Sequence, residues 1–254
     1  MFFAALGFAL VIGILLGMLG GGGSILTVPV LIYALGFDPK LAIAMSLPIV
    51  GFTSAIGAWR HWRAGNVNVR QALLFGIVAM TGAYVAGRAS RGIDPRIQLA
   101  ILGVAMTGAA ISMLHSASND AAARPAETKR SPWFLYGVGL AVGVLTGVVG
   151  VGGGFLIVPA LVVLGGIPMR QAVGTSLMVI AMNCAAGFAG QAGHQPIDWR
   201  FVATFSVVAT GGIVSGAMLL TYIRQQTLKR AFAVLLLMIA ALILWQNRSL
   251  LGFS

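Results

Sequence analysis

The stretch Gly17-Met18-Leu19-Gly20-Gly21-Gly22-Gly23-Ser24-Ile25-Leu26-Thr27-Val28-Pro29 places a run of glycines inside an apolar region, and it occurs twice. The second copy lies 130 positions later and reads Gly147-Val148-Val149-Gly150-Val151-Gly152-Gly153-Gly154-Phe155-Leu156-Ile157-Val158-Pro159. The similarity runs without a gap from Gly13–Arg70 to Gly143–Arg200, with seventeen identities in fifty-eight positions. A duplicated apolar unit with a broken helix in each copy is typical of transporters whose site lies where the copies meet.

The composition makes lipid the main solvent of the chain. Of 254 residues, 59% are hydrophobic and 8% are charged, whereas soluble domains carry about 25% charged residues. We therefore expect an all-α integral membrane protein whose first partner is the lipid bilayer. The net charge of +11 does not indicate nucleic-acid binding, because no soluble basic domain is present to carry it. Topology and the attraction of an anionic substrate explain the excess better.

The apolar stretches differ in length, and two of them are too short to span a membrane. These two, residues 24–36 and 154–165, follow the glycine runs directly and reach roughly 20 Å, against a hydrocarbon core about 30 Å thick. Inside a membrane, such a break survives only where protein buries it or where it lines a cavity. The other stretches lie at residues 3–19, 41–58, 71–88, 97–114, 133–149, 171–190, 201–222 and 231–246. The first of them lacks the basic start of a signal peptide, so we interpret it as a membrane segment.

Two interpretations compete for residues 3–36, a single crossing with a flexible middle or a hairpin that returns to its starting side. A single crossing gives each side eight Lys and Arg, whereas a hairpin gives ten on the side of the central linker and six on the other. Cytoplasmic loops carry the positive excess, which favours the hairpin. We thus expect two homologous, inverted repeats, each a glycine-broken helical hairpin plus three transmembrane helices. Residues 1–114 and 133–250 form the repeats, 115–132 is a polar cytoplasmic linker, and both termini are periplasmic in a bacterial inner membrane.

The glycine segments are the candidate substrate site. Each exposes backbone N–H groups at the start of a short helix, where the helix dipole favours a negative guest. Glycine also permits a positive φ, which we expect at Gly22 and Gly152. The alternative role is close helix packing by small residues spaced four apart. The candidate residues in these segments are Gly20, Gly21, Gly22, Gly23, Ser24, Gly150, Gly152, Gly153 and Gly154.

Polar groups on the next helix of each copy complete the candidate site. Ser46 and Thr53 lie seven residues apart on one helix face, and Ser176 and Asn183 repeat the spacing. They would either donate to an anion or hydrogen-bond to neighbouring helices. Pro29 and Pro159 either kink or end each half-helix.

The far ends of these helices differ between the copies. The first reads Trp59-Arg60-His61-Trp62-Arg63, which is typical of an anchor at headgroup depth. In the second, Gln191 and His194 would line the opposite mouth. His194 would either titrate near neutral pH or serve only as a polar cap at the helix end.

Carboxylates are absent from every apolar stretch, since Asp38, Asp94, Asp120, Glu127 and Asp198 all fall in expected loops. A carboxylate proton relay is therefore not expected, and neither is an enzyme, because no nucleophile stands beside a base. The single cysteine, Cys184, excludes an internal disulfide and argues against a thiolate metal site, so no cofactor or metal is expected.

Together these features resemble the sulfite exporter TauE/SafE family, also called the toluene-sulfonate uptake permease family, over nearly the whole chain. The resemblance rests on the paired glycine-to-proline stretches and the motif A-x-x-x-S-L at Ala42–Leu47 and Ala172–Leu177. The turns at Gly65–Arg70 and Pro196–Arg200 add to it. The copies differ where Ser24 stands against Gly154 and Asn68 against Asp198. The resemblance implies an inner-membrane permease for small sulfur-containing anions such as sulfite, sulfonates or sulfoacetate.

The leading hypothesis is a secondary transporter that works by alternating access and holds its anion at the paired bends. The alternative is an anion channel lined by the same glycines. The anion, the direction, the coupling ion and the oligomeric state, a homo-oligomer included, stay open at this point.

Overall fold

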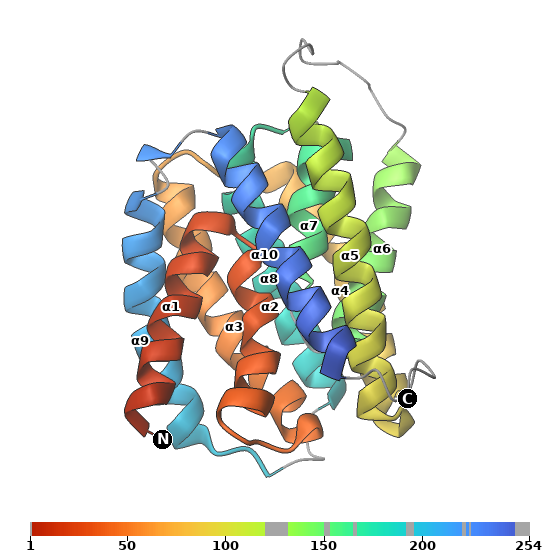
Figure 1. Ribbon diagram of the computed structural model, residues 1–254. Helices are drawn as coiled ribbons and strands as arrows, with labels where there is room; N and C mark the ends of the chain where they lie inside the picture. Colours follow the sequence, from red (N-terminus) through yellow and green to blue (C-terminus); the bar gives the residue numbers. More distant parts are fainter. Residues whose placement is uncertain are drawn as a thin grey trace.

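The computed structural model describes residues 2–119, 132–149, 153–164, 167–191, 196–219, 222–223 and 225–246. Within these residues every regular element is a helix, and the helices form one bundle (Figure 1). Five of them are long and apolar enough to cross a membrane: Pro39–Arg63, Val69–Ala89, Pro95–His115, Met169–Gln191 and Trp199–Leu219. The expected all-α membrane fold is confirmed.

Apart from the short helix η2, each described element of the first half has a counterpart in the second. The first half contains α1 (Phe2–Leu19), α2 (Gly22–Pro29), the π-helix η1 (Val30–Ala34), α3 (Pro39–Arg63), α4 (Val69–Ala89), the short 3-10 helix η2 (Ser90–Gly92) and α5 (Pro95–Asn119). The second contains α6 (Pro132–Val149), α7 (Gly154–Pro159), the π-helix η3 (Ala160–Leu164), α8 (Met169–Gln191), α9 (Trp199–Leu219) and α10 (Gln225–Gln246). Apart from α7, each of these second-half helices begins 130 residues after its counterpart, so the correspondence extends well beyond Arg70 and Arg200.

The chain follows the hairpin path at its start. In Figure 1, α1 runs away from the end of the bundle that carries both termini, and α2 returns toward it, so that α3 begins where α1 began. The two helices of the hairpin touch, because a Cβ atom at Gly23 would lie 2.5 Å from the backbone nitrogen of Leu16. α5 ends and α6 begins at the opposite end of the bundle, and α1 and α6 therefore run in opposite directions.

The prolines change the helix type rather than ending the half-helix. Pro29 is the last residue of α2, and the chain continues through η1. A proline lacks the N–H that an α-helical ladder needs at that position. The ladder then widens, and Leu35 N–H donates to the carbonyl of Val30, five residues back, at 3.0 Å. Pro159 and η3 repeat this arrangement.

The copies pack against each other through matched helix pairs. α1 packs on α9 and α6 on α4, while α3 packs on α8 and α5 on α10. In the first two pairs, Gly13 lies against the carbonyl of Ala209 and Gly143 lies against the carbonyl of Ala79. The same contact thus occurs twice with the roles of the copies exchanged. Small residues allow this close approach in membrane helices.

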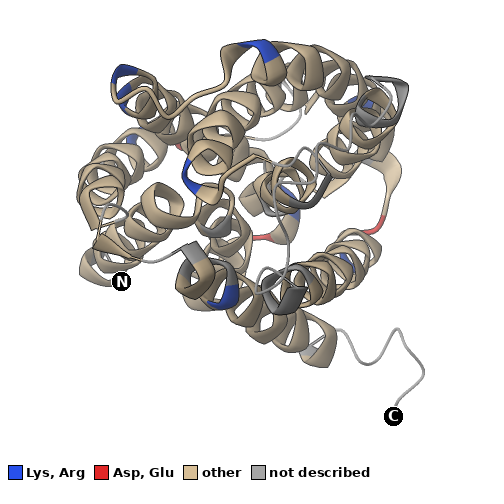
Figure 2. Cartoon of the chain, turned by 90° about the horizontal axis from the view of Figure 1, so that it is seen from above, with Lys and Arg blue, Asp and Glu red and all other residues tan. Residues whose placement is uncertain are grey.

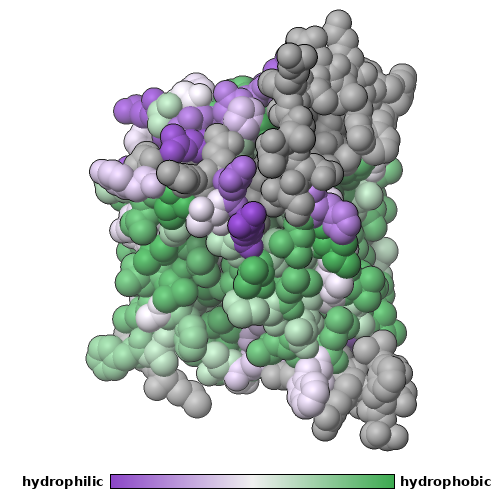
Figure 3. All heavy atoms as spheres, turned by 45° about the horizontal axis from the view of Figure 1, so that its top comes forward, coloured by the Kyte–Doolittle hydropathy of each residue, from purple (hydrophilic) through white to green (hydrophobic). Residues whose placement is uncertain are grey.

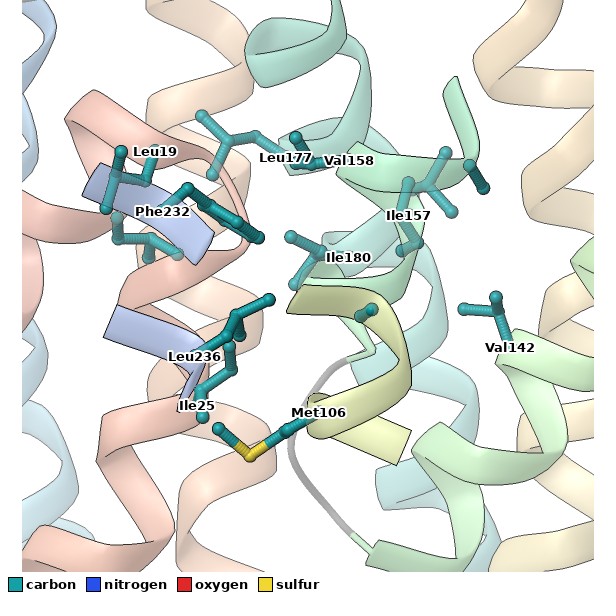
Figure 4. Close-up of a cluster of buried hydrophobic side chains, with 14 of the residues drawn as sticks. Leu19, Ile25, Met106, Val142, Ile157, Val158, Leu177, Ile180, Phe232 and Leu236 are labelled. Carbon is teal, nitrogen blue, oxygen red and sulfur yellow. The ribbon is translucent and has the colours of Figure 1, made fainter. Parts of the chain in front are cut away.

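The burial pattern separates a protein core from a lipid-facing surface. α3 and α8 are the most buried of the spanning helices, and side chains from both copies pack at the centre (Figure 4). Large apolar side chains are exposed on the outer helices, and a green band crosses the middle of the face seen in Figure 3. Viewed along the helices, basic residues are spread over several elements and acidic residues are few (Figure 2). This distribution is that of a protein dissolved in a bilayer.

Candidate substrate site

The first bend is built from backbone that only glycine adopts easily. α1 ends at Leu19, and Gly20 follows with a φ of 70°. Its N–H donates to the carbonyl of Leu16 at 2.9 Å. Gly21 then begins α2 as its N-cap with no side-chain cap among the described residues. The expected left-handed glycine therefore lies at Gly20, and its expected position at Gly22 is wrong, because Gly22 is already the first residue of the right-handed helix α2.

The second bend has its left-handed glycine at a different position of the repeat. Gly153, with a φ of 68°, is the N-cap of α7, and its counterpart in the first copy is Gly23. Gly154 stands where the first copy has Ser24, whose hydroxyl donates to the carbonyl of Gly21 at 2.7 Å. Gly150 and Gly152 lie outside the described residues.

The starts of the two half-helices meet between the copies. A Cβ atom at Gly154 would lie 2.5 Å from the Cα of Gly21. A Cβ atom at Gly20 would lie 2.6 Å from the hydroxyl oxygen of Ser176 and 3.0 Å from the Cα of Val173. The fold thus brings Gly20, Gly21 and Gly154 together against α8.

One face of α8 lines this meeting point. Ser176 contacts Gly20, and Ile180, four residues later, contacts Gly154. Asn183 follows one turn further on the same face. Its side chain is fully buried, and neither amide atom has a hydrogen-bond partner among the described residues. Buried polar groups are nearly always satisfied, so the amide of Asn183 is the group here that most needs a partner.

The hydroxyl groups of the candidate site are engaged locally. Ser46 donates to the carbonyl of Ile43 at 2.8 Å, Ser176 repeats this bond to Val173 at 2.8 Å, and Thr53 donates to Ile49 at 2.7 Å. A hydroxyl carries a single proton. Each would therefore have to leave its own helix before it could donate to a solute.

The described residues around the meeting point are buried in this conformation. The candidate residues Gly20, Gly21, Gly23, Ser24, Ser46, Thr53, Gly153, Gly154, Ser176 and Asn183 are all buried. Two hollows lie in the surface, one between α1 and α10 and one between α5, α6 and the α7–η3 segment, and neither is lined by a candidate residue.

Gln191 lies away from the other candidates, at the far end of α8. It is eight residues beyond Asn183, and its Nε2 donates to the carbonyl of Gly147 at 3.1 Å. This bond ties the end of α8 to α6. His194 lies outside the described residues.

His61 is the polar residue that the sequence analysis missed. Trp59 and Trp62 are half exposed, and the guanidinium of Arg63 lies 4.5 Å from the ring centre of Trp59, as expected of an anchor. His61 points the other way and is only 4% exposed. The sequence signal that could have identified His61 is its alignment with the candidate residue Gln191, 130 positions later.

In the described part of the chain, no group of three or more His, Cys, Asp or Glu side chains could hold a metal ion. A bundle of apolar helices with paired breaks defines a multi-pass membrane protein.

Comparison with known proteins identifies the family. The chain matches the family described as Sulfite exporter TauE/SafE over residues 5–243, and it belongs to that family. A "Probable membrane transporter protein" of Xylella fastidiosa (strain 9a5c) is 30% identical over 240 residues, covering 93% of this chain and 92% of the relative. The Methanocaldococcus jannaschii protein MJ0441, with the same description, is 31% identical over 183 residues, covering 70% and 67%. YdhB of Bacillus subtilis, also so described, is 25% identical over 222 residues, covering 87% and 91%. No solved structure matches the chain significantly. The chain is therefore a membrane transporter.

Proposed function

We propose that this transporter moves a small sulfur-containing anion, such as sulfite, a sulfonate or sulfoacetate, across the bacterial inner membrane by alternating access. The termini face the periplasm and the linker faces the cytoplasm. The family description supports the substrate class, and the excess of basic residues on the linker side supports the orientation.

The observation that carries the proposal is the unpartnered amide of Asn183 beside the meeting point of the two bends. The first N–H groups of a helix have no intrahelical partners, and those of α2 begin at this point. An anion would accept hydrogen bonds from these N–H groups and from the Asn183 amide without a counter-charge buried in lipid. The absence of carboxylates from α1, α3, α4, α8 and α9 leaves nothing there to repel it.

The burial of the described residues at the two glycine bends favours a carrier over a channel. A channel needs a continuous path, whereas Gly20, Ser176 and Asn183 are all buried. Alternating access instead opens a central site to one side at a time, by rocking one repeat against the other.

The function is tested in liposomes that contain the purified protein. Radiolabelled sulfite should enter faster than into empty liposomes, the rate should saturate with concentration, and unlabelled sulfite inside should accelerate entry of the label. Sulfonates and sulfate in parallel define the class. A flux that never saturates would indicate a channel, and no flux for any sulfur anion would overturn the proposal.

The variant Asn183→Leu distinguishes a role of the Asn183 amide in binding the anion from a role in stabilising the fold. Leucine has a similar size and removes the unsatisfied amide, so the variant should unfold at a higher temperature, with a gain of about 1–3 kcal/mol. Sulfite transport should fall at least roughly tenfold because a charge-assisted hydrogen bond is lost.

Asn183→Thr is the matched control, because Thr53 occupies the equivalent position of the first copy. It keeps a donor and should retain part of the activity. Wild-type transport by Asn183→Leu would remove the residue from the site.

A further inference from the structure

A groove lies on the outside of the bundle between α1 and α10, two helices at the front of the view in Figure 1. Its volume is about 560 Å³. The groove forms because each helix has its main partner elsewhere, since α1 packs chiefly on α9 and α10 on α5. It therefore separates a helix of the first repeat from a helix of the second. One of its lining residues, Leu19, directly precedes the left-handed Gly20 of the first bend. We call it the α1–α10 groove.

The walls of the α1–α10 groove are apolar and face away from the protein core. Apart from Thr227 and Arg230, every described residue that lines it is apolar, and Leu15 of α1 and Val234 and Met238 of α10 are examples. The side chains of Val234 and Met238 are 50% and 60% exposed, so the groove opens toward the surroundings of the bundle. In a bilayer these surroundings are lipid tails, which are as apolar as leucine.

Arg230 gives this apolar groove a positive charge near one end. It lies five residues after Gln225, where α10 begins, and therefore roughly 7.5 Å along the helix. α10 begins at the end of the bundle where α5 ends (Figure 1). The side chain of Arg230 is exposed, and its long apolar stem allows the guanidinium to reach headgroup depth. The helices α1 and α10 contain no Asp or Glu, so neither wall supplies a counter-charge.

The second groove of the bundle is a counterpart that lacks the charge. It lies between α5, α6 and the α7–η3 segment, and no charged residue lines it in the described part of the chain. Some residues of the two grooves are 130 positions apart, in the pairs Ala105 and Leu235, Gly108 and Met238, and Leu145 and Leu15. The position equivalent to Arg230 is Ala100. The two repeats therefore provide related grooves of which one carries a cation.

We propose that the α1–α10 groove binds an anionic phospholipid, with an acyl chain along its apolar wall and the phosphate paired with Arg230. A guanidinium suits this role because it donates two parallel N–H groups to a phosphate. Basic pockets between transmembrane helices bind acidic headgroups in this way. The bound lipid bridges the two repeats beside the first bend. This inference goes beyond the proposed substrate and mechanism, because it concerns the lipid-facing surface and holds for any transported solute.

The experiment measures the affinity of the first bound lipid by native mass spectrometry of the detergent-solubilised protein. It compares phosphatidylglycerol, which is anionic, with phosphatidylcholine, which is zwitterionic, at matched acyl chains. Phosphatidylglycerol should bind at least roughly fivefold more tightly, as expected for one basic residue that meets an acidic headgroup. Arg230→Gln should abolish this preference, and Arg230→Lys, which keeps the charge, should retain part of it.

Two control variants separate the groove from the rest of the surface. Arg70→Gln removes an exposed charge at the start of α4, at the same end of the bundle, and should leave the preference unchanged. Val234→Trp fills the groove without a change of charge and should weaken the binding of phosphatidylglycerol, because the acyl chain loses contacts with the wall. Val104→Trp places the same bulk at the equivalent exposed position of α5 and should have no such effect.

The proposal is overturned if Arg230→Gln keeps the preference for phosphatidylglycerol, or if Arg70→Gln lowers it equally. It is also overturned if Val234→Trp binds this lipid as tightly as the wild type, or if glycerol phosphate, which has no acyl chain, displaces the lipid at equal concentration. A protein dimer that Val234→Trp dissociates would assign the groove to a second copy of the chain instead. Circular dichroism checks that each variant is folded. No transport is measured, so a failure to transport sulfite would not affect this result.

Discussion

The two ends of the bundle have equivalent backbones but differ in the side chains that hold them closed. We call the end at which α3 and α5 end the linker end, and the end at which α8 and α10 end the terminal end. At the terminal end the carbonyl of Gly147 accepts from Gln191 and, at 3.3 Å, from the hydroxyl of Ser90. Gln98 Nε2 donates to the neighbouring carbonyl of Val148 at 2.8 Å. In the sequence, His61 aligns with Gln191, while the positions equivalent to Ser90 and Gln98 are occupied by Leu220 and Leu228, which carry no hydrogen-bonding side-chain group.

A repeat protein can thus have two ends with equivalent backbones that differ in how strongly side chains hold them closed. Alternating access requires that each half be able to adopt the other's conformation, which constrains the backbone. Side chains then set which end opens more readily. A typical hydrogen bond contributes about 0.5–1.5 kcal/mol, so the bonds from Ser90 and Gln98 together stabilise the closed terminal end by about 1–3 kcal/mol. We expect the linker end to open first.

The largest effect should follow from the variant Gly20→Ala, which disturbs the backbone conformation of the first bend. Alanine at Gly20 would have to adopt a left-handed φ and would also meet the hydroxyl of Ser176. We expect sulfite transport in liposomes to fall by at least roughly tenfold, because displacement of reacting or binding groups by even an ångström is costly.

Gly36→Ala is the control for strain. Gly36 has a φ of 74°, but no neighbouring atom lies within 4 Å of an added Cβ. It should cost about 1 kcal/mol of stability and keep transport. Equal losses in both variants would mean that strain alone, and not the contact between the copies, accounts for the effect.

An intermediate effect should follow from Gln98→Leu, which gives the terminal end the residue found at the linker end. The variant loses the bonds from Gln98 to Val148 and, at 3.4 Å, to Ser90. Alkylation of the native Cys184 by a small maleimide should accelerate about three- to tenfold, as expected for the loss of roughly 1 kcal/mol. Unchanged alkylation would show that these bonds do not keep the terminal end closed.

The smallest effect should follow from Ser24→Gly, which gives the first bend the residue of the second. Only the bond from the Ser24 hydroxyl to Gly21 is lost, so stability should fall by about 0.5–1.5 kcal/mol and transport should change less than in Gly20→Ala. The thermal midpoint and sulfite uptake check both statements. Complete loss of transport would make Ser24 a substrate ligand in its own right.

Much of the fold was predictable because broken helices leave a strong signal. The glycine runs and the prolines Pro29 and Pro159 interrupt the apolar helices and recur 130 residues apart. They therefore located both half-helices. The counterparts α4 and α9, or α5 and α10, share little sequence, since a lipid-facing helix needs only to be apolar. The π-helices that follow the prolines were not predicted, because their widened ladder depends on backbone contacts.

The site was less predictable because burial depends on which helix approaches. Trp59 and Trp62 made the end of α3 look like a surface anchor, yet His61 between them is buried and packs against Gly174. The glycine run gave no means of telling a left-handed residue from a helical one, so Gly22 was named in place of Gly20. Whether an amide such as Asn183 has partners is likewise decided only by tertiary packing.

The most direct test of anion binding at the meeting point of the bends uses selenite, a heavier analogue of sulfite. Anomalous diffraction from crystals of the protein would locate the bound selenium. If the anion binds at the bends, a selenium peak will lie within hydrogen-bonding distance of the Asn183 amide and the first N–H groups of α2. The peak will be absent from crystals of Asn183→Leu. A peak elsewhere in the bundle, with none at the meeting point of the bends, would contradict this placement of the anion.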